Sequence, residues 1–196
     1  MENLLPLLGL VVVGVVTPGP NNLMVLASGA NWGLFRTLPH IAGISIGFPV
    51  MVAAVGLGFG AVFDVLPQLR DILKIVAFAF LLWLAWRIAR AGRPDAIGSR
   101  ARPLSFIEAA VFQWVNPKAW AIVFAAVALF ADGAGNQLVE VGLAAAAFGF
   151  VCVPNGIIWT LFGSAISRFL SDDTKRSRFN VTMAVLLVAS VIPTLL

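Results

Sequence analysis

The chain alternates between long apolar stretches and short polar ones, and the apolar stretches are long enough to cross a lipid bilayer. A transmembrane helix needs about 20 mostly apolar residues. Stretches of about this length cover residues 4–28, 41–63, 72–88, 106–130, 141–164 and 179–196. They are broken only by prolines and by charges near their ends, apart from Lys118 in the middle of the fourth. The pattern predicts an all-α polytopic membrane protein with six transmembrane helices. A five-helix alternative, in which the first stretch does not cross, stays open.

The composition supports this prediction and excludes other classes. Of the 196 residues, 60% are hydrophobic and 11% are charged, and the mean hydropathy is +0.97. Soluble domains carry about a quarter charged residues, and disordered chains have low hydrophobicity. The connections between the six stretches are short, so we expect one transmembrane domain over residues 1–196.

The basic residues indicate an orientation and not a nucleic-acid interface. The net charge is +4, but the basic residues lie in short segments between apolar stretches. Cytoplasmic loops of membrane proteins carry the excess of Lys and Arg. Ten of the thirteen basic residues fall on the side of the first, third and fifth connections: Arg36, Arg87, Arg90, Arg93, Arg100, Arg102, Arg168, Lys175, Arg176 and Arg178. We therefore predict that this side is cytoplasmic and that both termini are outside.

Prolines recur at matching places in the two halves of the chain. The halves are residues 1–90 and 106–196, and a basic cytoplasmic loop of about residues 88–105 joins them. With three helices each, the halves run in opposite directions across the membrane. Interrupted helices at corresponding positions of inverted repeats mark the binding site of a transporter. The first helix contains the run Thr17, Pro18, Gly19, Pro20, Asn21 and Asn22, and the fourth contains Asn116, Pro117 and Lys118.

These interruptions should expose backbone groups in the middle of the membrane. A proline inside a helix frees the carbonyl four residues earlier, so Gly14, Val16 and Gln113 should each have a free carbonyl. Thr and Asn are good N-caps and Pro suits the first helical position. Thr17 and Asn116 are therefore expected to start fresh half-helices, whose N-terminal ends converge.

Converging helix N-termini favour an anion such as a carboxylate. Lys118 would add a full positive charge. The freed carbonyls, with Asn21, Asn22 and Gln113, could accept hydrogen bonds from an ammonium group. Donors at one end and acceptors at the other match a zwitterion, so the residues point to a small amino acid as the substrate.

Other polar and proline positions are secondary candidates for the transport path. Pro49 and Pro154 lie in the second and fifth stretches, and Asn155 follows directly; a packing kink is the alternative for both prolines. His40, the only histidine, could relay protons or could be an interfacial, capped side chain. Nothing has the spacing of a metal site or of a catalytic nucleophile, and no cofactor is expected.

Two ordered signatures resemble the LysE/RhtB family of amino-acid exporters. The first is the run from Thr17 to Asn22, followed by Gly33-Leu34-Phe35-Arg36 and Gly43-Ile44-Ser45-Ile46-Gly47-Phe48. The second is Pro103-Leu104-Ser105-Phe106 leading to Gln113-Trp114-Val115-Asn116-Pro117-Lys118. The segment 82–89 is similar to the end of that family's third helix. Within the family, the chain looks closest to the branch that exports cysteine and O-acetylserine, on the segments 103–118 and 155–180.

The resemblance implies an inner-membrane exporter of amino acids or related metabolites, driven by proton antiport, with both broken helices lining the path. Members that move lysine or arginine are expected to use acidic residues in the path. Here Asp64, Glu108 and Glu140 lie only near the ends of the stretches, so we predict a neutral substrate. The alternatives are a non-transporting membrane scaffold or sensor subunit and an intramembrane enzyme. The small-residue pair Gly43 and Gly47 allows either close packing within the chain or a homodimer.

Overall fold

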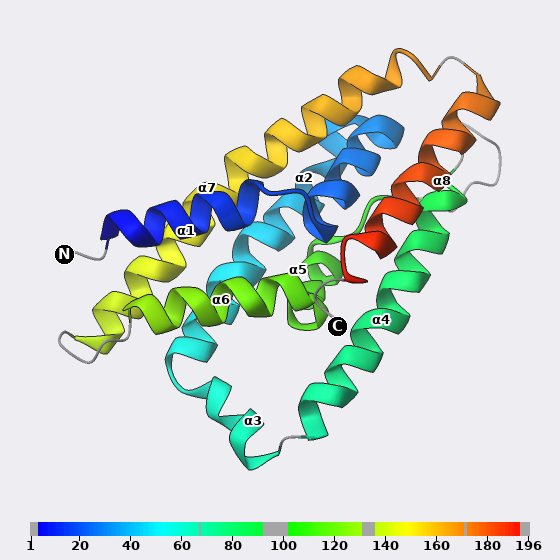
Figure 1. Cartoon of the computed structure of the whole chain (residues 1–196). Coiled ribbons are helices and arrows are strands. Elements are labelled where there is room, and N and C mark those ends of the chain that lie inside the picture. The colour runs from blue at the N-terminus through cyan, green and yellow to red at the C-terminus, as the bar shows by residue number, and fades with distance from the viewer. Residues whose placement is uncertain (1–3, 67, 92–101, 131–135, 171, 193–196) are drawn as a thin grey trace.

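The computed structural model describes residues 4–66, 68–91, 102–130, 136–170 and 172–192, and in these parts every regular element is a helix. Figure 1 shows α1, α2, α5, α6 and α7 packed together, with α4 and α8 side by side at one flank. The elements are α1 (Leu4–Val16), α2 (Pro20–Gly56), the 3-10 turn η1 (Phe59–Ala61), α3 (Val62–Val65), α4 (Gln68–Ala89), α5 (Phe106–Val115), α6 (Pro117–Phe130), α7 (Gln137–Ser167) and α8 (Asp173–Ala189).

Three of these helices are long and apolar enough to cross a membrane. They are α2, the segment Asp71–Ala89 of α4, and α7; the pair α5 and α6 makes a fourth if its two bent parts count as one span. Helix α1 is apolar but shorter, with 13 residues. By length and composition, the described residues thus contain three or four spans, and the arrangement of six spans in two inverted repeats stays a prediction.

Helix α2 combines parts of two predicted spans. It contains residues 20–28 of the first span and residues 41–56 of the second. Its backbone leaves helical geometry at Gly33, where φ is 76° and ψ is 177°. Only glycine adopts this conformation readily, so the chain changes direction there, as Figure 1 shows. Ser28 and Thr37 lie 2.7 Å apart across the bend. The helix that contains the second predicted span therefore begins just after Gly33, before residue 41.

The other predicted spans differ from the structure mainly at their ends. Helix α4 includes the whole third span, and α7 runs unbroken through Pro154. Pro154 is exposed on the outside of the helix, and α7 continues past it. The last helix, α8, begins at Asp173, six residues before the predicted span. Its start is set by Asp172, whose side chain accepts a hydrogen bond from Lys175 N and caps the helix.

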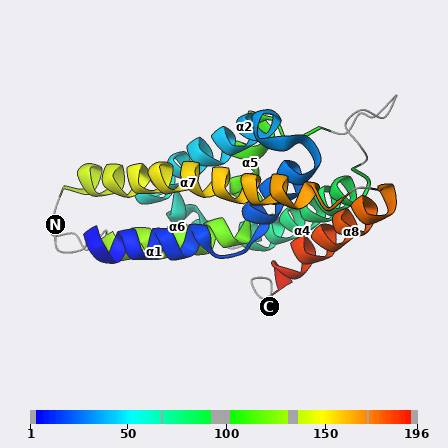
Figure 2. The same cartoon turned by 90° about the horizontal axis from the view of Figure 1, so that it is seen from above.

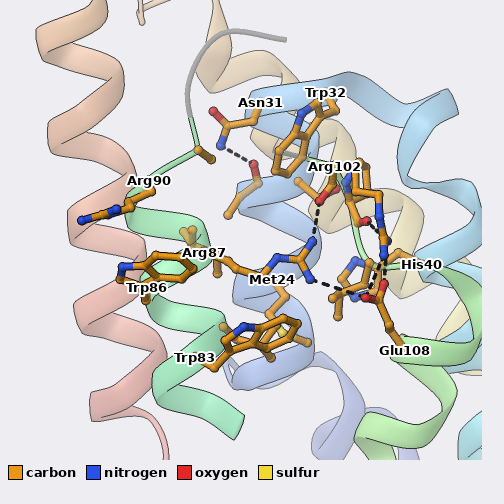
Figure 3. A pocket seen from close by; sticks show the side chains of 17 residues that line it. Met24, Asn31, Trp32, His40, Trp83, Trp86, Arg87, Arg90, Arg102 and Glu108 are labelled. Carbon is orange, nitrogen blue, oxygen red and sulfur yellow. Dashed lines mark hydrogen bonds and ion pairs between the residues drawn. The ribbon is translucent and has the colours of Figure 1, made fainter. Parts of the chain in front are cut away.

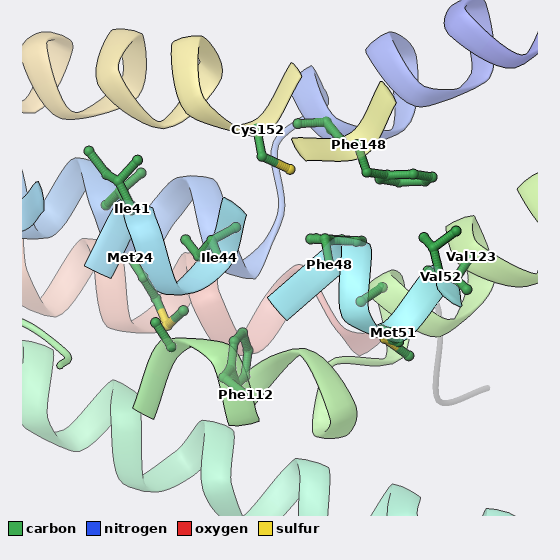
Figure 4. Close-up of a cluster of buried hydrophobic side chains, with 14 of the residues drawn as sticks. Met24, Ile41, Ile44, Phe48, Met51, Val52, Phe112, Val123, Phe148 and Cys152 are labelled. Carbon is green, nitrogen blue, oxygen red and sulfur yellow. The ribbon is translucent and has the colours of Figure 1, made fainter. Parts of the chain in front are cut away.

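The apolar core lies around α2. Phe48 of α2 stacks on Phe148 of α7 with ring centroids 5.3 Å apart, as Figure 4 shows. Gly43 and Gly47 let α5 approach closely: a Cβ on Gly43 would lie 2.3 Å from Phe106 O, and one on Gly47 would lie 2.8 Å from Ala110 Cα. These glycines therefore pack within the chain, which is the first of the two alternatives that the sequence left open.

Candidate functional site

The two helix breaks lie next to each other in space. Helix α1 ends at Val16 and α2 begins at Pro20, whereas α5 ends at Val115 and α6 begins at Pro117. The bend between α5 and α6 is 70°. Lys118 joins the breaks directly, since its Nζ donates to Thr17 O at 2.6 Å and lies 3.3 Å from Pro18 O. The ammonium thus neutralises the negative end of the α1 dipole.

Each fresh helix starts at a proline, but only one of the two predicted N-caps is correct. Asn116 caps α6, and its Oδ1 accepts a hydrogen bond from Lys118 N at 3.2 Å. The prediction for Thr17 is wrong, because the N-cap of α2 is Gly19 in extended geometry. The Thr17 hydroxyl turns back instead and donates to the carbonyls of Val13 and Gly14 at the end of α1.

The carbonyls freed by the prolines already have partners within the protein. The Asn22 Nδ2 group lies 3.3 Å from Val16 O, and also 2.8 Å from Val15 O and 2.9 Å from Thr17 O. The carbonyl of Gln113 accepts from Asn116 N at 3.3 Å. Since an unpaired carbonyl is costly in hydrocarbon, these contacts allow the chain to break in the middle of a helical bundle.

Two pairs of amide side chains connect the breaks to other helices. Asn21 of α2 and Gln113 of α5 exchange both amide hydrogen bonds, at 2.8 and 3.2 Å. Asn155 of α7 donates to Asn22 Oδ1 at 2.8 Å. These contacts join residues 92 and 133 positions apart in the chain. The predicted amide residues therefore form two pairs, and within each pair the amides bond to one another.

Gly19 makes room for Lys118. A Cβ at this position would lie 2.7 Å from Lys118 Cδ and 2.9 Å from Lys118 Nζ. Any side chain here would push the lysine away from the break. The absence of a side chain at residue 19 thus allows Lys118 to contact Thr17.

A small cavity of about 30 Å³ lies at the breaks. This space holds little more than one water molecule, so the site has no room for an amino acid in this structure. Seven predicted site residues line it: Gly19, Pro20, Asn21, Asn22, Asn116, Lys118 and Asn155. Both helices begin with a proline, which has no N–H, and the next N–H of α6, that of Lys118, donates to Asn116 Oδ1. The Lys118 ammonium and the N-terminal ends of the two helices give this cavity a positive character.

The structure separates the remaining predicted residues from this cavity. Pro49 packs against Gly149 of α7, where its Cγ would lie 3.3 Å from an added Cβ, and Pro154 faces outward. Neither has a polar role at the breaks. Thr17, Pro18, Gln113 and Pro117 flank the cavity through the contacts described above without lining it. His40 is 1% exposed and lines a different cavity.

That second cavity measures about 470 Å³ and contains charged residues that the sequence analysis did not single out as a site. Figure 3 shows Arg87 of α4 directed toward Glu108 of α5 and toward Arg102. Arg102 binds both oxygens of Glu108, at 2.6 and 2.9 Å, and Arg87 Nη1 lies 3.6 Å from Glu108. The hydrogen bond to Glu108 raises the pKa of the Arg102 guanidinium.

One signal in the sequence could have found part of this cluster. Ser105 and Glu108 have the spacing of a capping box, and they form one: Glu108 N donates to Ser105 Oγ at 3.2 Å, and Ser105 N donates to Glu108 at 2.7 Å. A capping glutamate at the start of a helix can form an ion pair with a basic residue just before that helix, as Glu108 does with Arg102. The contact of Arg87 with Glu108 comes from another helix, so no local sequence pattern predicts it.

A helical protein with apolar spans, two adjacent helix breaks and a lysine between them has the features of a membrane transport protein. Residues 12–192 match the family model of the LysE type translocators, and the chain belongs to this family. A cysteine/O-acetylserine efflux protein of Salmonella choleraesuis is 32% identical over 184 residues, which are 90% of this chain and 89% of the relative. The protein of that name from Escherichia coli is 29% identical over 178 residues, with the same coverage. No solved structure matches the chain.

Family membership confirms two predictions made from the sequence. The resemblance to the LysE/RhtB exporters is correct, and it extends over nearly the whole chain. Because the family consists of translocators, the protein is a membrane translocator and not an enzyme.

Proposed function

We propose that the protein exports a small neutral amino acid, or a related metabolite, from the cytoplasm by proton antiport. Two of its relatives are named as efflux proteins for cysteine and O-acetylserine, and both of these molecules are small and carry a carboxylate and an ammonium group. Export of such a molecule agrees with the positive N-terminal helix ends and the lysine at the breaks.

The contact between Lys118 and Thr17 is the observation that carries this proposal. It brings together two helix breaks that are 101 residues apart in the chain. Helix breaks with satisfied carbonyls are found where a protein lines a substrate path. Opening the small cavity would give a carboxylate access to Lys118 and to the N-terminal ends of α2 and α6.

A neutral substrate fits the distribution of acidic residues. Asp64 lies in the short helix α3, and Glu108 and Glu140 lie in the first turns of α5 and α7. None of the three lines the cavity at the breaks. A cationic side chain of the substrate would therefore meet Lys118 without a compensating carboxylate.

The inverted repeat that we propose would have six spans, with the breaks in the first and fourth. The main helix packing supports it. Helix α2 packs on α7 and α4 packs on α8, so the second and third spans of the first half lie against their counterparts in the second half. Such pairing is expected around an internal two-fold axis. Rocking of the halves about the breaks would give alternating access, with the basic connections in the cytoplasm and both termini outside the inner membrane.

Inside-out vesicles that contain the protein test the proposal. A panel of labelled amino acids, including cysteine and O-acetylserine, is offered with a pH gradient across the membrane. We expect accumulation of small neutral members that stops when the gradient is dissipated. If no member accumulates while the protein is present in the membrane, transport is refuted; if a fixed partner protein also copurifies, a scaffold or sensor role is favoured.

Substitutions at the breaks test where the path lies. Asn116→Ala removes the cap of α6, and Pro18→Ala restores a backbone donor at the end of α1. We expect both to reduce the rate of transport at least about tenfold, with little loss of protein from the membrane. Normal transport by both variants would contradict a path through the breaks.

A further inference from the structure

The cavity of about 470 Å³ lies beside α2. It is lined by α2, α4, the first turn of α5 and the segment just before that helix. It shares no lining residue with the small cavity, but adjacent residues of α2 face the two: Met24 and His40 line the large one, and Val25 and Ile41 line the small one. Its volume is in the range of small-molecule sites, about 300–1,000 Å³.

The charges around this cavity favour an anion. Arg87, Arg90 and Arg102 line it together with one carboxylate, that of Glu108. Arg102 forms two hydrogen bonds with Glu108 and so neutralises it, whereas Arg87 donates to the carbonyl of Arg102 at 3.1 Å and lies 3.6 Å from Glu108. Positive charge therefore remains on Arg87 and Arg90.

Two of these guanidinium groups are held in place by tryptophans. Arg87 lies over the ring of Trp83 at 4.7 Å, and Arg90 lies over that of Trp86 at 5.0 Å. Stacking orients a planar guanidinium without using up its N–H donors. Arg87 thus presents donors to the cavity, as its position in Figure 3 indicates.

The same cavity is bordered by buried polar atoms that lack a partner. His40 is 1% exposed, and neither of its ring nitrogens has a hydrogen-bond partner; the same is true of Trp32 Nε1. Among the described residues, five buried side-chain nitrogen or oxygen atoms are unpartnered, and these two residues hold three of them. Such groups are costly to bury, and their concentration at one cavity indicates that a polar molecule satisfies them when it is bound.

We propose that this cavity is a loading site on the basic side of the protein, where the substrate amino acid binds through its carboxylate before it enters the breaks. Arg87 binds the carboxylate, Trp32 Nε1 donates to it, and His40 supplies one donor and one acceptor to the zwitterion. The inference rests on the proposed function, because it takes the exported amino acid as the ligand.

Two nearly isosteric variants test this role with little effect on folding. Trp32→Phe and His40→Leu each remove polar atoms that have no partner in the protein, so the melting temperature should stay the same or rise. Trp159→Phe is the matched control, since Trp159 lies on α7 and lines neither cavity. With labelled O-acetylserine added to inside-out vesicles, we expect KM to rise about tenfold in both variants, with Vmax nearly unchanged, and neither value to change in the control.

A binding measurement on the purified protein distinguishes this inference from the proposed function. O-acetylserine should raise the melting temperature of the unaltered protein and of Trp159→Phe, and should fail to do so in Trp32→Phe and His40→Leu at the same concentration. Serinamide, which lacks the carboxylate, should have no effect on any of them. Transport with an unchanged KM in both variants would overturn the loading site alone, whereas binding without any transport would overturn the exporter and leave the site.

Discussion

At the scale of single residues, Asn22 shows how one amide holds a helix break together. Its Nδ2 reaches the last carbonyls of α1, the nearest at 2.8 Å, and its Oδ1 accepts a hydrogen bond from Asn155. Only a side chain with both a donor and an acceptor can do this. The chemistry of residue 22, and not polarity alone, therefore stabilises the end of α1.

Asn22→Asp tests this dependence. The substitution keeps the shape but replaces the donor with a charged acceptor that faces carbonyl oxygens, so we expect a loss of about 2–3 kcal/mol of stability. Thermal unfolding in detergent measures it. Asn136→Asp is the matched control: Asn136 Oδ1 accepts from the backbone at the start of α7, and aspartate caps a helix equally well. Equal melting temperatures for the two variants would contradict the role of the Asn22 donor.

Gly19→Ala tests the position of Lys118. The added methyl would lie 2.7 Å from Lys118 Cδ, and the flexible lysine can move aside at little cost in stability. We therefore expect transport to fall at least about tenfold while the melting temperature changes little. Gly9→Ala is the control, because a Cβ on Gly9 meets no atom within 4 Å, and it should transport normally. Normal transport by Gly19→Ala would show that the Lys118 contact is not needed.

At the scale of elements, the bend within α2 divides that helix into two parts with different neighbours. The part before Gly33 carries the break and the paired amides and packs on α7, where Gly29 lies against the backbone of Thr160, and the part after it packs on both α5 and α7. One backbone conformation, with φ of 76° and ψ of 177°, separates the two.

Gly33→Ala should therefore be destabilising even though there is room for a methyl group. A Cβ at Gly33 meets no atom within 4 Å, so the cost is conformational and amounts to about 1–3 kcal/mol. Gly142→Ala, which has equal space inside α7, should instead leave the melting temperature unchanged or raise it. If both variants are as stable as the unaltered protein, residue 33 does not adopt the positive φ that forms the bend.

At the scale of the whole molecule, two cavities of very different size lie along α2, one of about 470 Å³ and one of about 30 Å³. The large cavity lies among basic residues, on the side that the charge distribution assigns to the cytoplasm. Under the proposed function, this arrangement would correspond to a state that loads substrate from that side, with little space at the breaks. Figure 2 shows the pair α4 and α8 at one end of the molecule, where a rigid-body movement of the pair would widen or narrow the large cavity.

Cysteine labelling tests the six-span topology. Cys152 is the only cysteine and is buried, so Cys152→Ala supplies a background without thiols. We expect single cysteines at Arg36 and Lys175 to react with an impermeant maleimide only in inside-out vesicles. A cysteine at Leu66 should react only in right-side-out vesicles. Reaction of all three from one side would contradict the inverted repeat.

The sequence by itself determined the helical membrane fold, the family and both helix breaks. The physical reason is that these features are local. A proline removes the hydrogen bond to the carbonyl four residues earlier, and Asn116 caps the helix that directly follows it. The length of an apolar stretch determines whether it can cross a membrane. Local rules also placed α4 and the bend between α5 and α6 correctly.

The tertiary structure decided which groups meet. Thr17 was predicted to cap α2, but it bonds back to α1 because Gly19 takes the cap. The carbonyls predicted to be free are occupied by Asn22 and Asn116, and Arg87 pairs with a glutamate on another helix. A partner 101 residues away, such as Thr17 for Lys118, depends on how whole helices pack, and no pattern within one segment of the chain specifies that.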